Sequence, residues 1–531
     1  MGLGILVYLN SLNGAFVIDD VTSIPKNPLV DQPLKNLIAG RLVHFTFSIN
    51  YLLGGLHPFI YHLTNIFIHL GVVILVYFFL LEIVSQKISL LAAAIFAVHP
   101  IHTEPVSWIS GRTYLLGTLF LLASLLLYII AYKRKKYFHY YYISSLICFL
   151  MAQLLEIKSV AFLLIIGLYE LIFGKIKKRW RWLIPYFALT LLFLASLVKP
   201  FLFRVSTQNP QYTGEISLFN PLRQIPAAIG SYIELFVWPM DLTFYHEDFT
   251  VHFFLRLGIT IALLCSLIYF YIKKHKILFF GFSLFILSLV PTLMPIKIAF
   301  VVAERYVYFG SIGLCLVAAW ALVEGLKKYP QVLFVVFGIL ILLLSARTIT
   351  RNRDWRTFES LWFATAKTSP TSSMAWNNVG YVYTERGNLE MAIEAFQRAI
   401  SLNPRHAGAH HNLGIAYFKL KNYDQAIFWF EKSIALNPVP QVYQDLGVVY
   451  VEKGEFGKAE EQFRKILKFD PNCVMAYNSL GVIFYKQGRI EEARLMWQKA
   501  LELDPNSVGV KKNLILLEQN LQASPSASPQ L

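Results

Sequence analysis

Apolar residues in this chain gather before residue 350, in runs long enough to cross a membrane as helices. Three clear runs are Phe59 to Glu82, Thr113 to Tyr132 and Gln331 to Leu344. A helix needs about 20 mainly apolar residues to cross roughly 30 Å of hydrocarbon. Charged residues make up only 15% of the chain, whereas soluble proteins carry about 25%. The sequence therefore predicts an all-α, polytopic membrane domain.

The apolar runs predict eleven spans. They cover residues 1–15, 59–84, 88–101, 113–132, 138–155, 159–174, 182–198, 253–272, 277–296, 306–323 and 331–348. Residues 1–15 have no basic start and no cleavage site of small residues. We therefore expect a short or truncated first span there and not a cleaved signal peptide.

Short clusters of Lys and Arg between the spans carry most of the net charge of +16, at residues 133–136, 175–181, 273–276 and 327–328. With the N-terminus inside, every cluster lies on the cytoplasmic side, and the odd number of spans puts the C-terminal part outside. Counting Ile225 to Trp238 as a twelfth crossing would move two clusters outside, so we expect an interfacial or re-entrant segment there. This charge distribution favours membrane lipids as partners and not nucleic acid.

A repeat with a period of 33 or 34 residues fills the C-terminal part of the chain. Its markers recur in four copies: Gly380, Gly414, Gly447 and Gly481; Ala392, Ala426, Ala459 and Ala493; Pro404, Pro438, Pro471 and Pro505. Small residues that let two helices approach, followed by a helix-ending proline, are typical of tetratricopeptide (TPR) repeats. Stacked TPRs form an α-solenoid with a concave face.

The sequence thus predicts a membrane domain over 1–348, a linker over 349–373, four TPRs over 374–508, and a capping helix with a disordered tail over 509–531. Aromatic residues of the repeats are expected to pack in their core. Asn377, Asn412 and Asn478, in the first helices, are candidates for the ligand face, where an amide can bind an extended peptide backbone. Hydrogen bonding between helices is an equally good reading of these residues.

Polar residues that could carry chemistry lie at the predicted outer ends of spans. The acidic pair Asp19 and Asp20 follows the first span. The segment from His99 to Arg112 places two histidines, His99 and His102, close to Glu104 and Arg112 at a membrane boundary. Such groups are costly there unless they are paired or functional. Only one carboxylate lies near the two histidines, so hydrogen bonding is favoured over metal binding, and a divalent metal is not indicated.

Two further pairs combine a glutamate with a cation: Glu156 with Lys158, and Glu304 with Arg305. A lysine or arginine at a span end can bind a phosphate headgroup, and arginine can do so through two hydrogen bonds. The alternative is a pair that only fixes two helices together.

Several blocks, taken in this order, resemble the transmembrane and TPR-containing O-mannosyltransferases and their bacterial relatives, within the lipid-dependent family C glycosyltransferases. The blocks are Tyr8 to Gly14, Phe16 to Asp20, Asn27 with Pro28, Tyr61 to Asn65, His69, His99 to Arg112, Ala303 to Tyr306, and the TPRs. The chain departs from the family in its short first span and in Ser159, where relatives carry an acidic residue.

The resemblance implies inverting transfer of a sugar from a polyprenyl-phosphate donor to an acceptor hydroxyl on the outer or lumenal face, with no tightly bound cofactor. Asp19 or Asp20 would be the catalytic base. Arg112, Lys158 and Arg305 would bind the donor phosphate, with His99, His102, Glu104 and Glu304 in support. The TPRs would bind a protein or peptide acceptor, or another partner.

Two alternatives stay open: a ligase or polymerase of lipid-linked oligosaccharides, and a non-enzymatic membrane scaffold built around the TPRs. A plain anchor does not require an acidic pair and several Glu–cation pairs on eleven spans, so the scaffold ranks last. The predicted location is a multi-pass membrane, the bacterial inner membrane or alternatively the endoplasmic reticulum, with extracytoplasmic TPRs.

Overall fold

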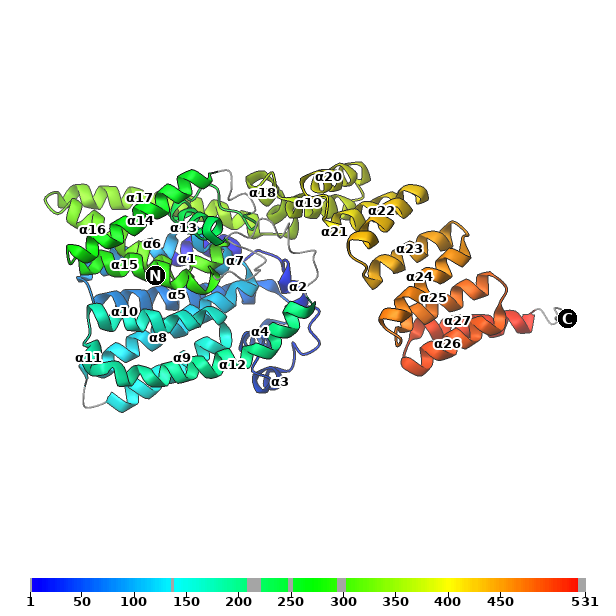
Figure 1. The fold of residues 1–531 in the computed structure, drawn as a ribbon, viewed down its shortest axis with the longest axis horizontal. Helices are drawn as coiled ribbons and strands as arrows, with labels where there is room; N and C mark the ends of the chain where they lie inside the picture. Colours follow the sequence, from blue (N-terminus) through cyan, green and yellow to red (C-terminus); the bar gives the residue numbers. More distant parts are fainter. Residues whose placement is uncertain (1, 135–137, 208–220, 247–251, 294–301, 524–531) are drawn as a thin grey trace. The chain divides into compact units, whose positions relative to one another are not determined.

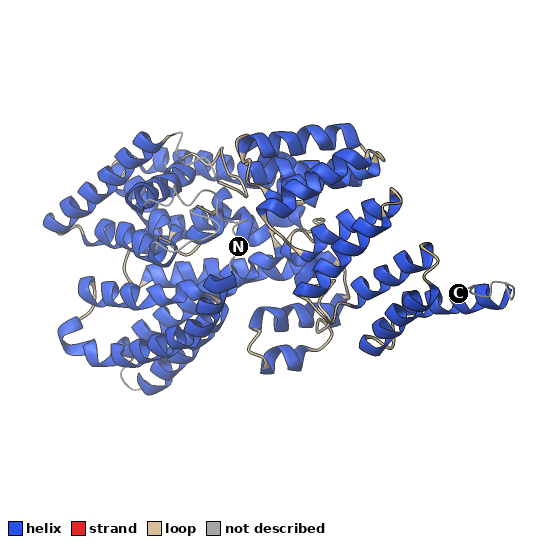
Figure 2. Cartoon of the chain, turned by 45° about the vertical axis from the view of Figure 1, so that its right-hand side comes forward, coloured by secondary structure: helices blue, strands red, loops and turns tan. Residues whose placement is uncertain are grey.

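The computed structural model describes residues 2–134, 138–207, 221–246, 252–293 and 302–523. These residues form helices joined by loops, and no strand occurs among them (Figure 2). The chain divides into two compact units, with the boundary between Ser372 and Ser373. We call them the membrane unit and the repeat unit. The predicted all-α class is confirmed.

Six helical stretches of the described chain are long and apolar enough to cross a membrane. Five of them contain α5 (Pro58–Leu81), α8 (Arg112–Lys133), α9 (Phe138–Leu155), α14 (Phe253–Ile272) and α17 (Pro330–Asn352), and the sixth contains α12 (Ile184–Thr207) up to Lys199. Continuous apolar sequence forms helices in lipid because a helix satisfies its own backbone hydrogen bonds. The molecule is therefore a multi-pass membrane protein, as predicted.

The other predicted spans coincide with shorter helices. These are α1 (Gly2–Tyr8), α6 (Gln86–Val98), α10 (Phe162–Ile172), α15 (Lys276–Leu289) and α16 (Ser311–Gly325). The 13 residues of α6 extend about 20 Å at 1.5 Å per residue, less than the thickness of a bilayer core. The count of eleven crossings stays a prediction. Residues 225–238 lie mainly in α13 (Pro221–Val237), which is largely buried.

Glycine permits the closest helix contact in the membrane unit. A Cβ atom added at Gly313 on α16 would lie 2.1 Å from the backbone oxygen of Gly281 on α15. Small residues allow such approach between membrane helices, where dispersion and not the hydrophobic effect drives association. The pair therefore fixes how α15 and α16 pack.

Short helices gather at one end of the membrane unit: α2 (Asp19–Ser23), α3 (Pro33–Ile38), α4 (Leu42–Gly54), α7 (Thr103–Ser107) and α18 (Phe358–Thr368). Figure 1 shows α2 and α7 toward the end away from α11 (Ile176–Arg179). Basic residues occupy the α11 end, where Lys133 pairs with Glu82 and Arg179 lies 3.2 Å from Glu170. Polar loops and basic turns thus lie at opposite ends.

The repeat unit stacks helix pairs, which are α19 (Ser373–Glu385) with α20 (Leu389–Leu402), α21 (Ala407–Lys419) with α22 (Tyr423–Leu436), α23 (Pro440–Glu452) with α24 (Phe456–Phe469), and α25 (Val474–Lys486) with α26 (Ile490–Leu503). Helix α27 (Val508–Ala523) follows, and the predicted tail lies outside the described residues from 524 onward. Each repeat glycine faces an aromatic ring of its second helix; a Cβ at Gly414 would lie 2.7 Å from Phe430.

Candidate active site

Chain segments that are distant in sequence meet at the polar end of the membrane unit. The amide of Ala15 donates a hydrogen bond of 2.8 Å to the carbonyl of Arg356. Asn352, the last residue of α17, donates to the carbonyl of Val7 at 2.7 Å and accepts from the hydroxyl of Ser107 at 2.9 Å. The first loop, the His99 to Arg112 segment and the segment after the last span therefore form one surface.

A strained turn at Ile18 directly precedes the two acidic residues. Ile18 has φ 50° and ψ −119°, and the amide of Asp20 donates to the carbonyl of Val17 at 3.0 Å. This is the geometry of a type II′ turn with Ile18 in the position that normally holds glycine. A branched residue with positive φ costs about 1–3 kcal/mol, and such strain clusters at functional sites.

Asp20 is completely buried and fully bonded. One carboxylate oxygen accepts from the amide and the hydroxyl of Ser110, at 2.8 and 2.5 Å, and the other accepts from the amide of Val17 at 3.1 Å. Burial raises the pKa of Asp20 to about 6, although these hydrogen bonds oppose the shift. The carboxylate therefore links the first loop to the turn before α8.

Asp19 points the other way. Its side chain is exposed and forms no hydrogen bond or ion pair with the part of the chain that the structure describes. The turn at Ile18 thus gives the two neighbouring carboxylates opposite environments. Only Asp19 is open to a substrate.

His99 and His102 are buried and hydrogen-bonded. The Nδ1 atom of His99 accepts from the amide of Ile101 at 3.2 Å, and its Nε2 atom lies 2.9 Å from the carbonyl of Phe236. The two nitrogens of His102 lie 2.8 Å from the carbonyl of Phe96 and 2.8 Å from the hydroxyl of Ser311. Both rings therefore connect helices.

Arg112 is enclosed at the start of α8. Its guanidinium donates to the side chains of Asn65 and Asn50 at 2.7 and 2.6 Å, to Thr46 at 3.1 Å and to the carbonyl of Tyr61 at 2.8 Å. Because the side chain is fully buried, this arginine joins α4, α5 and α8. It does not face the cavity that holds the other two predicted cations.

Lys158 and Arg305 line the same cavity, which opens between α8, α10 and the 3₁₀ turn at residues 304–307. The ammonium of Lys158 lies 3.1 Å from Glu156 and 4.1 Å from the ring centre of Tyr306. Burial lowers the pKa of Lys158 to about 8, although Glu156 opposes the shift. Arg305 pairs with Glu104 through its side chain, and its amide donates to the same carboxylate at 2.8 Å.

Glu304 lies beside this pair but belongs to a second buried contact. Its carboxylate is 3.3 Å from the guanidinium of Arg351, which in turn lies 2.8 Å from Asp354. Burial raises the pKa of Glu104, and the Arg305 charge opposes the shift. Arg305 thus pairs with Glu104, and Arg351 pairs with Glu304 and Asp354.

The three candidate asparagines of the repeat unit bond to other asparagines. Asn412 donates to Asn377 at 2.9 Å, and Asn513 donates to Asn478 at 2.9 Å. They do not share one repeat position, since Asn412 lies two residues before its glycine while Asn377 and Asn478 lie three before theirs. These asparagines therefore form hydrogen bonds between neighbouring helices. His411 likewise lies 2.7 Å from the carboxylate of Asp445 in the next first helix.

Profiles of the tetratricopeptide repeat match residues 380–421, 407–438, 440–473 and 474–507. Over a longer stretch, the human protein O-mannosyl-transferase TMTC3 is 26% identical and covers 77% of this chain and 51% of its own. This chain is a homologue of transmembrane, TPR-containing O-mannosyltransferases. The predicted resemblance is confirmed, and the chain spans about half the length of that human homologue.

A second O-mannosyltransferase homologue, F38B6.6 of Caenorhabditis elegans, is 28% identical over 76% of this chain and 62% of its own. Among solved structures, a crystal structure of the MamA protein is 26% identical, covers 33% of this chain and 87% of that chain, and has a TM-score of 0.26.

Sequence reasoning missed Tyr114, Arg351 and His246 in this O-mannosyltransferase homologue. Tyr114 lines the cavity of Lys158, with its ring centre 4.4 Å from the ammonium. Arg351 could have been found, because a mixed run of charges from Arg351 to Arg356 directly follows an apolar span. No sequence signal marks His246, whose partner Glu304 is distant in the chain.

Proposed function

We propose that this chain is a membrane glycosyltransferase that moves a sugar from a polyprenyl-phosphate donor to a protein Ser or Thr hydroxyl on the extracytoplasmic face. The names of its homologues indicate mannose as the sugar. The observation that carries the proposal is the shared cavity of Lys158 and Arg305, at the end of the membrane unit where Asp19 is exposed.

The donor phosphate binds between Lys158 and Arg305. An ammonium and a guanidinium suit a phosphate diester because charge-assisted hydrogen bonds are short and strong. The cavity has a volume of about 20 Å³ and apolar walls at Leu121, Ile165 and Phe309. It holds about one water molecule, so its lining must open to admit the phosphate and the first prenyl units. Glu104 and Glu156 hold the cations in place before the donor arrives.

Asp19 is the general base. Its exposed carboxylate takes the proton of the acceptor hydroxyl while the hydroxyl oxygen attacks the anomeric carbon from the face opposite the phosphate. The bond from that carbon to the phosphate oxygen breaks, and the configuration inverts. The departing phosphate keeps the electron pair and needs no acid, because Lys158 and Arg305 offset its charge.

Asp20 and Arg112 position the reacting groups instead of contacting them. Asp20 ties the loop of Asp19 to Ser110, and Arg112 joins three helices beneath that loop. His99, His102 and Glu304 have the same supporting part in this scheme. We assign acceptor recruitment to the repeat unit, whose first helices carry a row of amides and a His–Asp pair.

The first test replaces the base. Asp19→Asn in the full-length protein should lower sugar transfer to a Ser/Thr peptide by about 100-fold or more, the usual contribution of a positioned base. The measurement is glycopeptide formation in membranes that contain polyprenyl-phosphate sugar. Asp31→Asn is the matched control, because Asp31 is an exposed aspartate of the same loop.

Transfer by Asp19→Asn at the rate of Asp31→Asn would exclude Asp19 as the base. A normal amount of folded protein in the membrane must accompany the loss, as judged by gel filtration in detergent. Loss of activity in both variants would indicate a general effect on the loop.

A further inference from the structure

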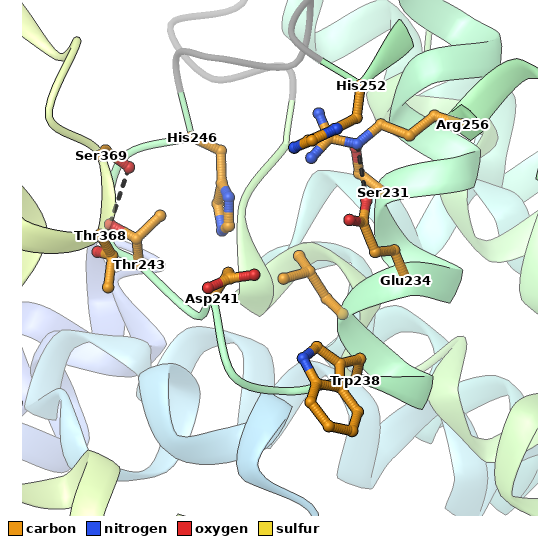
Figure 3. Close-up of a pocket in the computed structure, with 11 residues that line it drawn as sticks. Ser231, Glu234, Trp238, Asp241, Thr243, His246, His252, Arg256, Thr368 and Ser369 are labelled. Atoms are coloured by element: carbon orange, nitrogen blue, oxygen red, sulfur yellow. Dashed lines mark hydrogen bonds and ion pairs between the residues drawn. The ribbon is translucent and has the colours of Figure 1, made fainter. Parts of the chain in front are cut away.

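A second cavity opens at the polar end, apart from the cavity of Lys158 and Arg305. It has a volume of about 170 Å³ and lies between the end of α13, the start of α14, residues 241–246 and the end of α18. Figure 3 shows Asp241 and His246 on one side of this space and Glu234 and Arg256 on the other, with Trp238 below them. No residue that we assigned to donor or base lines it.

Residues 241–246 separate the two cavities. Thr243 and His246 line the second cavity. Phe244, between them, lies with its ring centre 5.7 Å from the guanidinium carbon of Arg305. His246 also approaches Glu304, at 3.7 Å. A ligand in the second cavity would therefore press on the segment that packs against the donor-binding arginine.

The lining combines neutralised charge with free hydrogen-bonding capacity. Arg256 lies 2.8 Å from Glu234, so these two charges compensate each other. Asp241 is exposed and bonds to no residue that the structure describes, and the hydroxyl of Thr243 accepts a bond of 3.4 Å from Ser369. The lining therefore presents one uncompensated carboxylate, Asp241, among neutral donors and acceptors.

The volume of this second cavity and the chemistry of its lining indicate which kind of ligand it can bind. A cavity of about 150 Å³ holds one six-membered ring in other proteins, so this one accommodates a single ring. Trp238 is 65% exposed, and an exposed indole at a cavity mouth offers an apolar surface together with one N–H donor. Carboxylates, hydroxyls and imidazoles provide the acceptors and donors that adjacent sugar hydroxyls require.

We propose that this cavity is a second saccharide site that binds one neutral hexose unit, separate from the donor. The hexose could be free or attached to a peptide that has already been glycosylated. The inference goes beyond the proposed transfer reaction, because it concerns binding and does not require that the chain be an enzyme.

The test measures binding of methyl α-mannoside and methyl α-glucoside to the full-length protein in lipid nanodiscs, by saturation-transfer NMR. We expect saturable binding that Asp241→Asn and Trp238→Ala each weaken at least tenfold. Both side chains are exposed, so the variants should fold. Asp31→Asn is the control that should leave hexoside binding unchanged, because Asp31 is exposed and lines neither cavity.

Two further binding measurements, with a glycosylated peptide and with a lipid-linked sugar, identify the source of the hexose. Tighter binding of an O-mannosylated Thr peptide than of the bare peptide or free hexoside would assign the site to glycosylated acceptor, and equal binding of hexoside and glycopeptide would assign it to the sugar alone. Competition by polyprenyl-phosphate mannose would overturn the proposal, because it would make the cavity part of the donor site.

The proposal is also overturned if neither hexoside binds, or if both variants bind as tightly as the wild type. Saturable Mn²⁺ binding that Asp241→Asn abolishes, without hexoside binding, would identify a metal site instead. Failure of the proposed transfer reaction is a separate result, since a protein without transfer activity that still binds hexoside through Asp241 refutes only the enzymatic function.

Discussion

At Ile18 the backbone adopts a conformation that favours glycine, and this residue decides which aspartate faces outward. With φ 50° and ψ −119°, its side chain is strained. Ile18→Gly should therefore stabilise the fold by about 1 kcal/mol, because relief of strain exceeds the added freedom of the unfolded chain. Thermal unfolding in detergent measures this.

Ile49→Gly is the matched control, since Ile49 lies inside α4 of the same loop. Glycine in a helix interior costs about 1 kcal/mol, so this variant should unfold at a lower temperature. Equal destabilisation by the two variants would show that the turn at Ile18 is not strained.

We expect the proposed donor binding to depend on pH through the buried ammonium of Lys158. Because burial lowers its pKa to about 8, the side chain is charged below that pH and loses its charge as the pH rises above it. Affinity for polyprenyl-phosphate sugar should fall between pH 7.5 and about 9.5. Binding of radiolabelled donor in nanodiscs at a series of pH values measures this.

Lys158→Arg should remove that pH dependence, because a guanidinium stays charged throughout the range. Lys35→Arg, at an exposed position of the first loop, should leave it unchanged. A wild-type affinity that is constant from pH 7.5 to 9.5 would contradict a phosphate contact by Lys158.

The sequence predicted the residue types of the site better than their roles. Lys158 and Arg305 stood out because charges at span ends are costly. The sequence could not show which of Asp19 and Asp20 is buried, because the difference lies in hydrogen bonds that Asp20 accepts from Ser110, which is 90 positions away. It also could not place Arg112, whose acceptors at Asn50 and Asn65 come from other helices.

Among the helices, apolar length predicted most of the membrane unit. However, α1 covers only residues 2–8 of the predicted span 1–15, and residues 294–296 of the predicted span 277–296 lie outside the described chain. The short helices of the first loop were not predicted. Helix α4 carries exposed apolar side chains at Leu52 and Leu53, and periodicity alone does not assign so short an apolar run. The repeat helices followed directly from the spacing of their glycines.

The packing of α15 on α16 depends on Gly313. A Cβ atom there would lie 2.1 Å from a backbone oxygen, so the helices must separate to admit any side chain. Gly313→Ala should destabilise the protein by more than about 2 kcal/mol through overpacking, measured by thermal unfolding in detergent.

Gly325 provides the control on the same helix, because no atom lies within 4 Å of a Cβ built there. Gly325→Ala should be neutral or stabilising, by up to about 1 kcal/mol, since alanine favours the helix. Destabilisation by both substitutions would mean that the Gly281–Gly313 contact is not the cause.

At the scale of the whole molecule, the membrane unit has a basic end and a polar end, as shown by its ion pairs and its loop contacts. Lys133 and Arg179 lie in ion pairs at one end, and the loops that carry Asp19 and Arg305 lie at the other. Residues after the last span join the polar end, where Arg356 accepts a bond from Ala15. These contacts support our proposal that the repeats follow on the extracytoplasmic side.

Helix length alone does not give the number of crossings, because helices such as α6 are shorter than the bilayer core is thick.

We propose a sugar donor linked to a lipid phosphate and not to a nucleotide. The most direct measurement supplies the purified full-length protein in liposomes with a Ser/Thr peptide and either polyprenyl-phosphate mannose or a nucleotide-linked mannose, and detects glycopeptide by mass spectrometry. We expect transfer from the lipid donor only, with inversion at the anomeric carbon. Transfer from the nucleotide sugar, or from neither donor, would contradict the proposal.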